Sequence, residues 1–224
     1  MLACIPDVLT ADEIKKLREE AALLPFVPGA ETAGGRARRV KNNEQISQKA
    51  EERKALHEIV IGALMRNKLF NRAALPKRIR PPLISRYREG MAYGQHVDNA
   101  MMGPKQARER SDVSITVFIS DIDEYDGGEL IIHSAYGAQE VKLPSGSVVA
   151  YPSYSLHEVA EVTRGERLVA VTWAQSYVRD DRQREILASL AEIKEKMNEL
   201  APDALETDQA HHVYANLLRM WAEM

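Results

Sequence analysis

The sequence predicts a mainly β protein with helices on either side of the β region. Between residues 83 and 177, short runs of β-branched or aromatic residues are separated by Gly, Pro, Asp and Ser, a pattern typical of strands joined by turns. Apolar residues recur at helical spacing before residue 80 and again after residue 178. These observations favour a β sandwich or barrel, with the jelly roll among the candidates, that carries helices at both ends.

The first helix is expected to begin after Thr10. Thr10 and Glu13 have the spacing of a capping box. Apolar residues follow at helical intervals: Ile14, Leu17, Ala21 and Leu24. Residues 26–40 are rich in Gly, Ala and Arg and are expected to form a long loop. A second helix is predicted over residues 47–69, before three prolines between residues 76 and 82 end the helical region.

The β core is expected over residues 81–178, which join the N-terminal helices of residues 1–80 in one domain, 1–178. Turn-forming residues at 126–128 and 144–146 support this division into short strands. Eight strands are predicted, at residues 83–87, 93–97, 113–119, 128–133, 139–143, 147–151, 157–162 and 167–177.

Residues 179–224 are predicted to form a C-terminal helical extension. Two amphipathic stretches lie on either side of Pro202, marked by Ile186, Leu187, Leu190 and Ile193, and by Tyr214, Leu217, Leu218 and Trp221. We expect this extension to cap the core or to form a subunit contact, so that a homo-oligomer through the C-terminal helices is a candidate assembly.

Composition argues against several classes of protein. The chain of 224 residues has a formal net charge of −3, which disfavours general nucleic-acid binding. Its single cysteine, Cys4, leaves no internal disulfide, and no run approaches the roughly 18 apolar residues of a membrane span. No signal peptide is recognisable at the N-terminus. The expected location is the cytoplasm, with neither a membrane nor a nucleic acid as partner.

The most informative motif is His96-Val97-Asp98, followed much later by His157. Residues two apart on a strand project to the same face, so His96 and Asp98 are able to bind one metal ion together. His157 would complete a set of two histidines and one carboxylate, which leaves coordination positions open and suits a non-haem ferrous oxygenase. His133 lacks a carboxylate two residues away, so we expect a structural or solvent-facing role for it.

Arg167 follows His157 on a predicted strand. Val169, Val171 and Trp173 continue at period two, so Arg167 shares a face with apolar side chains. On an interior face an unpaired guanidinium would cost roughly several kcal/mol in desolvation, and an anionic partner is therefore expected. That partner is either a protein carboxylate or the far carboxylate of a chelating co-substrate.

Three segments resemble the prolyl-4-hydroxylase-like oxygenases: RYREGMAYGQHVD at 86–98, DGGEL at 126–130 and PSYSLH at 152–157. Over nearly the whole chain, including the segment VKNN at 40–43 and the helical tail, the sequence is similar to the bacterial PKHD-type hydroxylases. That family includes proteins described as iron-uptake factors.

The resemblance implies a double-stranded β-helix core and an Fe(II)- and 2-oxoglutarate-dependent dioxygenase. It implies that His96, Asp98 and His157 bind iron, that Arg167 anchors 2-oxoglutarate, and that Tyr87 lies beside this co-substrate. L-Ascorbate is the implied reductant. The expected reaction hydroxylates a small-molecule or peptide substrate with dioxygen and converts 2-oxoglutarate to succinate, and the family association favours a link to iron uptake.

Two other functions are compatible with these residues. One is a non-catalytic sensor of iron or 2-oxoglutarate on the same scaffold. The other is a cupin-like metalloprotein or small-molecule-binding barrel without 2-oxoglutarate, against which Arg167 argues.

Three features near the motif have more than one interpretation. The basic cluster Arg36–Lys41 is either a solvated loop or, with Asn42-Asn43, part of a substrate mouth. Residues 99–110 are either a lid over the site or flexible filler. Tyr93 is expected to be a core aromatic residue.

Overall fold

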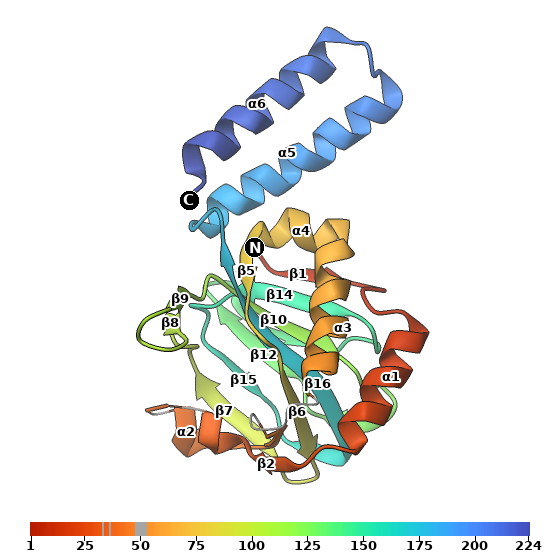
Figure 1. Cartoon of the computed structure of the whole chain (residues 1–224), viewed down its shortest axis with the longest axis vertical. Helices are drawn as coiled ribbons and strands as arrows, with labels where there is room; N and C mark the ends of the chain where they lie inside the picture. The colour runs from red at the N-terminus through yellow and green to blue at the C-terminus, as the bar shows by residue number, and fades with distance from the viewer. Residues whose placement is uncertain (33, 36, 48–52) are drawn as a thin grey trace.

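The computed structural model describes residues 1–224 except 33, 36 and 48–52, and its centre is a pair of antiparallel sheets (Figure 1). In the described residues the larger sheet has nine strands, in the order β1 (Ala3–Ile5), β14 (Val148–Pro152), β10 (Val113–Phe118), β16 (Val162–Ser176), β6 (Leu83–Arg88), β4 (Glu44–Ile46) and β2 (Phe26–Pro28), with β11 (Tyr125–Gly127) and β5 (Pro76–Ile79) also paired to β16. The smaller sheet has the order β13 (Gly137–Val141), β12 (Leu130–Ser134), β15 (His157–Val159), β7 (Ala92–His96) and β3 (Lys41–Asn42). A short hairpin pairs β8 (Met101–Met102) with β9 (Glu109–Arg110).

Side chains that alternate along the larger sheet separate two apolar cores. On β10, Val113, Ile115 and Val117 pack in the core between this sheet and the N-terminal helices. Phe118 faces the opposite way, into the core between the two sheets. Because successive strand residues point to opposite faces, Ser114 and Thr116 must also face the space between the sheets. The two antiparallel sheets, with helices before and after them in the chain, confirm the predicted mainly β jelly-roll fold class.

The helices occupy three places around the sheets (Figure 1). The outer face of the larger sheet is covered by α1 (Ala11–Ala22), α3 (Arg53–Arg66) and α4 (Lys68–Ala74). The short η1 (Gly29–Thr32) and α2 (Ala37–Val40) lie near β7 and β3. The C-terminal α5 (Asp181–Leu200) and α6 (Leu205–Trp221) form a hairpin that extends from the core and contacts α4 through α5.

Two helix predictions are confirmed by local geometry. Thr10 and Glu13 form the capping box at the start of α1: the Thr10 hydroxyl accepts a hydrogen bond from Glu13 N, and the Glu13 carboxylate accepts one from Thr10 N. The C-terminal helix α5 ends before Pro202, at Leu200, and α6 begins after it, at Leu205. The division of the chain into a 1–178 domain and a 179–224 extension stays a prediction.

Several predicted boundaries are wrong for identifiable reasons. The helix expected over 47–69 is two helices, because the Asn67 side chain caps a new helix by accepting from Phe70 N at 2.9 Å. The start of that prediction, residues 48–52, lies outside the described residues. The loop expected over 26–40 contains β2, η1 and α2. The last strand begins at Val162 rather than at residue 167, and the N-terminal 80 residues also supply β1 to β5.

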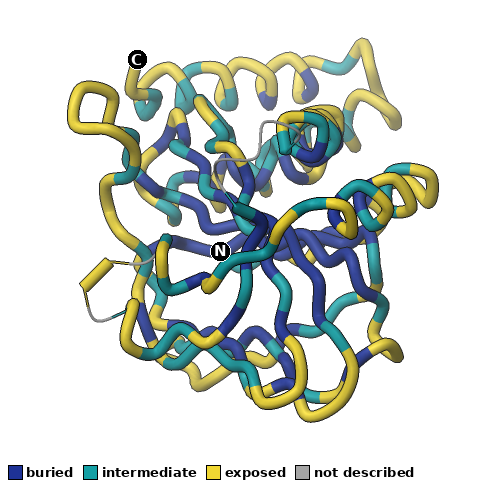
Figure 2. Tube along the Cα trace, turned by 60° about the horizontal axis from the view of Figure 1, so that its bottom comes forward, coloured by how far each residue is buried: buried dark blue, intermediate teal, exposed yellow. Residues whose placement is uncertain are grey.

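Burial follows this layered arrangement. Figure 2 shows buried residues concentrated in the central strands and exposed residues in the outer loops and helices. Among the described residues, no helix combines the length and the apolar character required to cross a membrane.

Candidate active site

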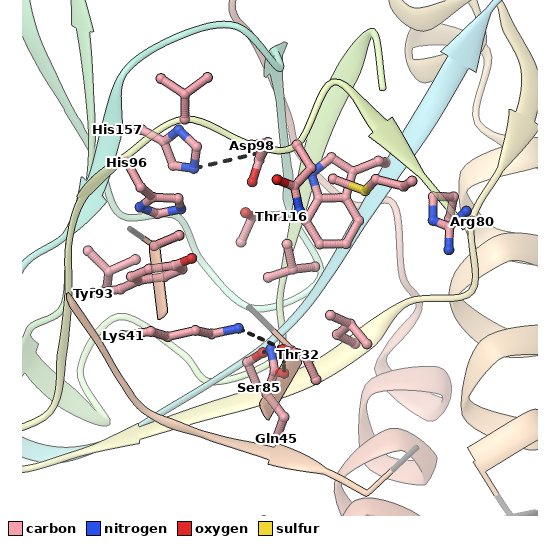
Figure 3. Close-up of a pocket in the computed structure, with 18 of the residues that line it drawn as sticks. Thr32, Lys41, Gln45, Arg80, Ser85, Tyr93, His96, Asp98, Thr116 and His157 are labelled. Carbon is pink, nitrogen blue, oxygen red and sulfur yellow. Dashed lines mark hydrogen bonds and ion pairs between the residues drawn. The ribbon is translucent and has the colours of Figure 1, made fainter. Parts of the chain in front are cut away.

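A cavity of about 520 Å³ lies between the two sheets (Figure 3). Its walls come from inward-facing residues of β6, β10 and β16 on one side and of β7 and β15 on the other. All five residues predicted to form the site line it: Tyr87, His96, Asp98, His157 and Arg167.

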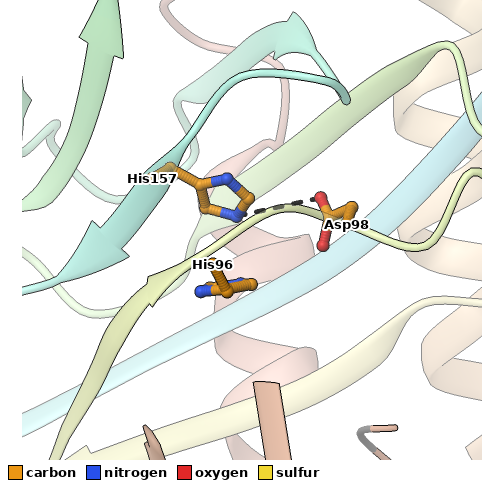
Figure 4. Close-up of side chains that lie close together, drawn as sticks. All are labelled: His96, Asp98 and His157. Atoms are coloured by element: carbon orange, nitrogen blue, oxygen red, sulfur yellow. Dashed lines mark ion pairs between the residues drawn. The ribbon is translucent and has the colours of Figure 1, made fainter. Parts of the chain in front are cut away.

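The metal-binding candidates converge at one end of this cavity (Figure 4). His96 ends β7 and His157 begins β15, and the two residues are directly opposite each other in the antiparallel pair. Asp98 follows two residues after His96. One donor atom from each of the three residues lies within 4.8 Å of the others, and His157 Nε2 is 3.8 Å from Asp98 Oδ2. The three side chains are therefore close enough to share one metal ion.

Backbone hydrogen bonds fix both imidazole rings. His96 Nδ1 lies 2.9 Å from the carbonyl oxygen of Gly94, and His157 Nδ1 lies 2.9 Å from that of Ser155. A carbonyl only accepts hydrogen bonds, so each Nδ1 carries the proton and each Nε2 keeps its lone pair for a metal. Burial lowers the pKa of His96 to about 4, and the neighbouring His157 adds to this shift. His96 is thus neutral near pH 7, as metal binding requires.

A serine pair orients the Asp98 carboxylate. The Ser114 hydroxyl donates to Asp98 Oδ2 at 2.6 Å and lies 2.8 Å from the Ser153 hydroxyl. Ser114 and Ser153 are both buried. Strand alternation places Ser114 on the inner face of β10, where its hydroxyl holds the Asp98 carboxylate.

Arg167 lies on another part of the cavity wall, and the residue is only 1% exposed. It is opposite Tyr87 in the pairing of β16 with β6, and its Cζ lies 5.1 Å from the centre of the Tyr87 ring and 5.7 Å from that of Phe118. Gly128 leaves room for the arginine stem: its φ is 68°, and a Cβ there would lie 3.0 Å from Arg167 Cδ.

Among the described residues, no carboxylate pairs with this guanidinium. Within the described part of the chain Arg167 takes part in no ion pair, and its buried Nε has no hydrogen-bond partner. A buried, unpaired cation is costly. The cavity therefore has the features that a chelating diacid needs, because it combines a three-ligand metal set with open positions and a buried guanidinium. These residues fit both Fe(II) and 2-oxoglutarate.

Two further residues line the cavity, and for one of them, Lys41, the sequence left open either a solvated loop or a substrate mouth. Tyr93, expected to be a core aromatic, stacks on the His96 ring with 3.6 Å between centroids and an interplanar angle of 15°. Lys41 lies over the Tyr93 ring, with Nζ 5.2 Å from the ring centre. Lys41 and Tyr93 are partners in the pairing of β3 with β7, a contact between distant parts of the sequence that periodicity alone does not reveal.

The remaining candidates divide between cavity wall and surface. His133 is hydrogen-bonded to Glu158 at 3.0 Å and does not line the cavity, as expected for a structural role. Arg38 and Arg39 are exposed on α2, whereas Lys41 lines the cavity. Arg36 lies outside the described residues. Of the segment 99–110, the cavity wall includes Asn99, Met101, Met102 and Gly103.

Comparisons with known proteins agree with this geometry. Residues 82–175 match the 2OG-Fe(II) oxygenase superfamily. A PKHD-type hydroxylase of Thioalkalivibrio sulfidiphilus is 46% identical and one of a Synechococcus species 45% identical, each over the whole of both chains. A prolyl-4-hydroxylase of Pseudomonas putida shares the fold with a TM-score of 0.55 at 19% identity, over 78% of this chain and 92% of that one.

A second solved structure also shares the fold. HygX of Streptomyces hygroscopicus, determined with nickel and 2-oxoglutarate bound, aligns with a TM-score of 0.52 at 15% identity, over 79% of this chain and 84% of that one. The family is shown by the relatives that are 45% and 46% identical over the full length of both chains. The chain therefore belongs to the PKHD-type hydroxylases of the 2OG-Fe(II) oxygenase superfamily and is a 2-oxoglutarate-dependent dioxygenase.

Proposed function

We propose that His96, Asp98 and His157 bind Fe(II), that Arg167 binds the distal carboxylate of 2-oxoglutarate, and that the protein hydroxylates a small-molecule or peptide substrate. The observation that carries this proposal is one cavity in which three metal-binding side chains and an unpaired, buried guanidinium occur together. The planar guanidinium suits a carboxylate because it donates two parallel hydrogen bonds.

When bound, the iron and 2-oxoglutarate supply the oxidising power, consuming dioxygen and releasing succinate and carbon dioxide as a C–H bond becomes C–OH. The protein contributes position and shielding. Gly94 and Ser155 hold the two imidazoles through their carbonyl groups, and Ser114 holds the Asp98 carboxylate. The rings of Tyr87 and Phe118 flank Arg167 and keep water from its guanidinium. We assign Tyr87 to the 2-oxoglutarate pocket on this contact. No side chain has to act as a general base.

The remaining parts of the proposal rest on the family and on composition. We propose L-ascorbate as the reductant that restores oxidised iron, and a link to iron uptake, because the PKHD-type resemblance implies both. A cytoplasmic location follows from the lone cysteine. A homo-oligomer would form through α5 and α6, which expose apolar residues such as Ile193 and Val213.

Succinate release tests the catalytic proposal. The purified protein, supplied with Fe(II), 2-oxoglutarate, ascorbate and dioxygen, should form succinate above the level of the His96→Ala variant. Wild-type turnover equal to that of the variant would contradict it. A non-catalytic sensor would instead bind iron and 2-oxoglutarate while no added compound becomes oxidised in step with decarboxylation.

A further inference from the structure

The cavity carries more positive charge than the metal and the co-substrate require. Among the described lining residues the cations are Lys41, Arg53, Arg80 and Arg167, and the only acid is Asp98. Arg80 forms an ion pair at 3.0 Å with Glu109, which also lies 3.5 Å from Arg78. With both ligands bound, the two positive charges of Fe(II) and the one of Arg167 equal the one negative charge of Asp98 and the two of 2-oxoglutarate. Among the described cavity residues, Lys41 and Arg53 are then left without a compensating negative charge.

Lys41 is the better placed of these two cations. Its ammonium group donates to Thr32 Oγ1 at 3.0 Å and lies over the Tyr93 ring, but it forms no ion pair with any carboxylate of the described residues. Burial lowers the pKa of Lys41 to about 8, although the charge of Asp98 opposes this shift. A half-buried ammonium with a neutral hydroxyl and an aromatic face as its partners is incompletely satisfied, and an anion would complete it.

Lys41 also lies within a small molecule's reach of the metal end. In Figure 3 the side chain of Tyr93 lies between those of His96 and Lys41. The His96 ring centre lies 3.6 Å from the Tyr93 ring centre, which lies 5.2 Å from Lys41 Nζ. Lys41 Nζ is therefore at most 8.8 Å, the sum of these distances, from the His96 ring centre. Trp173 and Met102 add apolar surface to the same cavity. A short aliphatic chain that ends in an acid is long enough to reach from Lys41 Nζ to the His96 ring.

We infer that Lys41 binds a carboxylate of the primary substrate, a small aliphatic acid whose reacting carbon is thereby held at the metal end of the cavity. This inference rests on the proposed function, because it assumes that Arg167 is occupied by 2-oxoglutarate. It narrows the substrate from any small molecule or peptide to an acid short enough to bridge Lys41 and the metal-binding residues.

Equilibrium binding to the zinc-loaded, 2-oxoglutarate-bound protein tests the inference without turnover. In a Trp221→Phe background Trp173 is the only tryptophan and reports on the cavity by fluorescence. The probes are straight-chain acids from propanoate to hexanoate, each compared with its primary amide. At least one acid should bind about tenfold more tightly than its amide. Lys41→Met should abolish this preference while leaving the amide unchanged, and Lys41→Arg should retain it.

A second measurement separates Lys41 from the co-substrate site. Under argon, 2-oxoglutarate is titrated into the iron-loaded protein and followed by the visible charge-transfer absorption of the chelate. Lys41→Met should match the wild type, whereas Arg167→Met should bind more weakly. Loss of 2-oxoglutarate affinity in Lys41→Met, equal affinity for acids and amides, or no saturable response to any acid overturns the inference. Absence of succinate release with the acid preference intact would instead count against the proposed function alone.

Discussion

The two kinds of charged site in the cavity differ in how completely the protein satisfies them. At the metal end each imidazole is held by a backbone carbonyl and the Asp98 carboxylate is held by Ser114. On the cationic wall, Arg167 Nε has no partner and Lys41 has only a hydroxyl and a ring. The fold therefore orients the metal end with its own groups, whereas it leaves hydrogen-bonding capacity unused on the cationic wall formed by Arg167 and Lys41. This difference predicts which substitutions abolish metal binding and which affect only the ligands.

Removing a metal-binding histidine should have the largest effect. His157→Ala deletes one of three donors, and we expect metal content and succinate release to fall to background because two remaining ligands bind Fe(II) weakly. The matched control is His133→Ala, on the neighbouring strand β12 and hydrogen-bonded to Glu158 instead of facing the cavity. It should retain metal. Metal analysis of both variants checks the comparison, and stoichiometric iron in His157→Ala would refute the ligand assignment.

Substituting the buried guanidinium should separate ligand binding from stability. We expect Arg167→Met to weaken 2-oxoglutarate binding about a hundredfold, since a charge-assisted hydrogen-bonded pair contributes roughly 2–3 kcal/mol. The ligand-free protein should be as stable as the wild type or more so, because the variant no longer buries an unpaired cation. Thermal melting with and without 2-oxoglutarate measures both quantities.

The control for this substitution lies on the same strand. Arg164 forms an exposed ion pair with Asp126, so Arg164→Met should change 2-oxoglutarate affinity little. If Arg167→Met strongly destabilised the ligand-free protein, Arg167 would be a structural residue whose charge is compensated within the fold.

Loss of the hydroxyl beside Asp98 should have a smaller effect. Ser114→Ala removes the 2.6 Å hydrogen bond to the carboxylate, and we expect about tenfold weaker metal binding, the lower end of the range for groups that orient a ligand. Ser134→Ala, at an exposed position on β12, is the control. Metal titration of the apo-protein distinguishes the two, and identical affinities would show that Asp98 needs no support from Ser114.

The sequence predicts the metal end better than the cationic wall. His96 and Asp98 are two residues apart, and one strand is enough to place them together. In contrast, β10 is buried on both faces. Its alternation places Ser114 and Thr116 on one face and Ile115 on the other, but it cannot tell which face borders the space between the sheets. Resemblance to a known family supplied the proposed roles of Tyr87 and Arg167, which the residue pattern alone left open.

Pairing between distant segments explains most of what the sequence did not reveal. Lys41 reaches the cavity because β3 pairs with β7, and nothing near Lys41 in the chain distinguishes it from the exposed Arg38 and Arg39. The division of the 47–69 helix had a local signal in Asn67, a residue that favours helix N-caps. The early start of β16 was harder to predict, because Gly165, with φ of 75°, lies within that strand.

The pH dependence of acid binding should give the smallest and most specific effect. Lys41 has a pKa of about 8 in the ligand-free protein, so the ammonium that binds a carboxylate is present below this pH and is lost above it. Acid affinity measured by Trp173 fluorescence should therefore be constant between about pH 6, where the probe carboxylates are ionised, and pH 8, and should fall by up to about tenfold per pH unit above pH 8.

Lys41→Arg should remove this pH dependence, because a guanidinium stays charged throughout the range. The charged or titratable groups close to Lys41 are Asp98, Tyr93 and His96. Asp98 and His96 are held by the metal in the loaded protein, and burial raises the pKa of Tyr93 above its ordinary value, so none of them should produce a transition near pH 8. A decline of the same slope in both proteins would place the titrating group elsewhere. A decline confined to the lysine form would identify the ammonium as the group that recognises the acid.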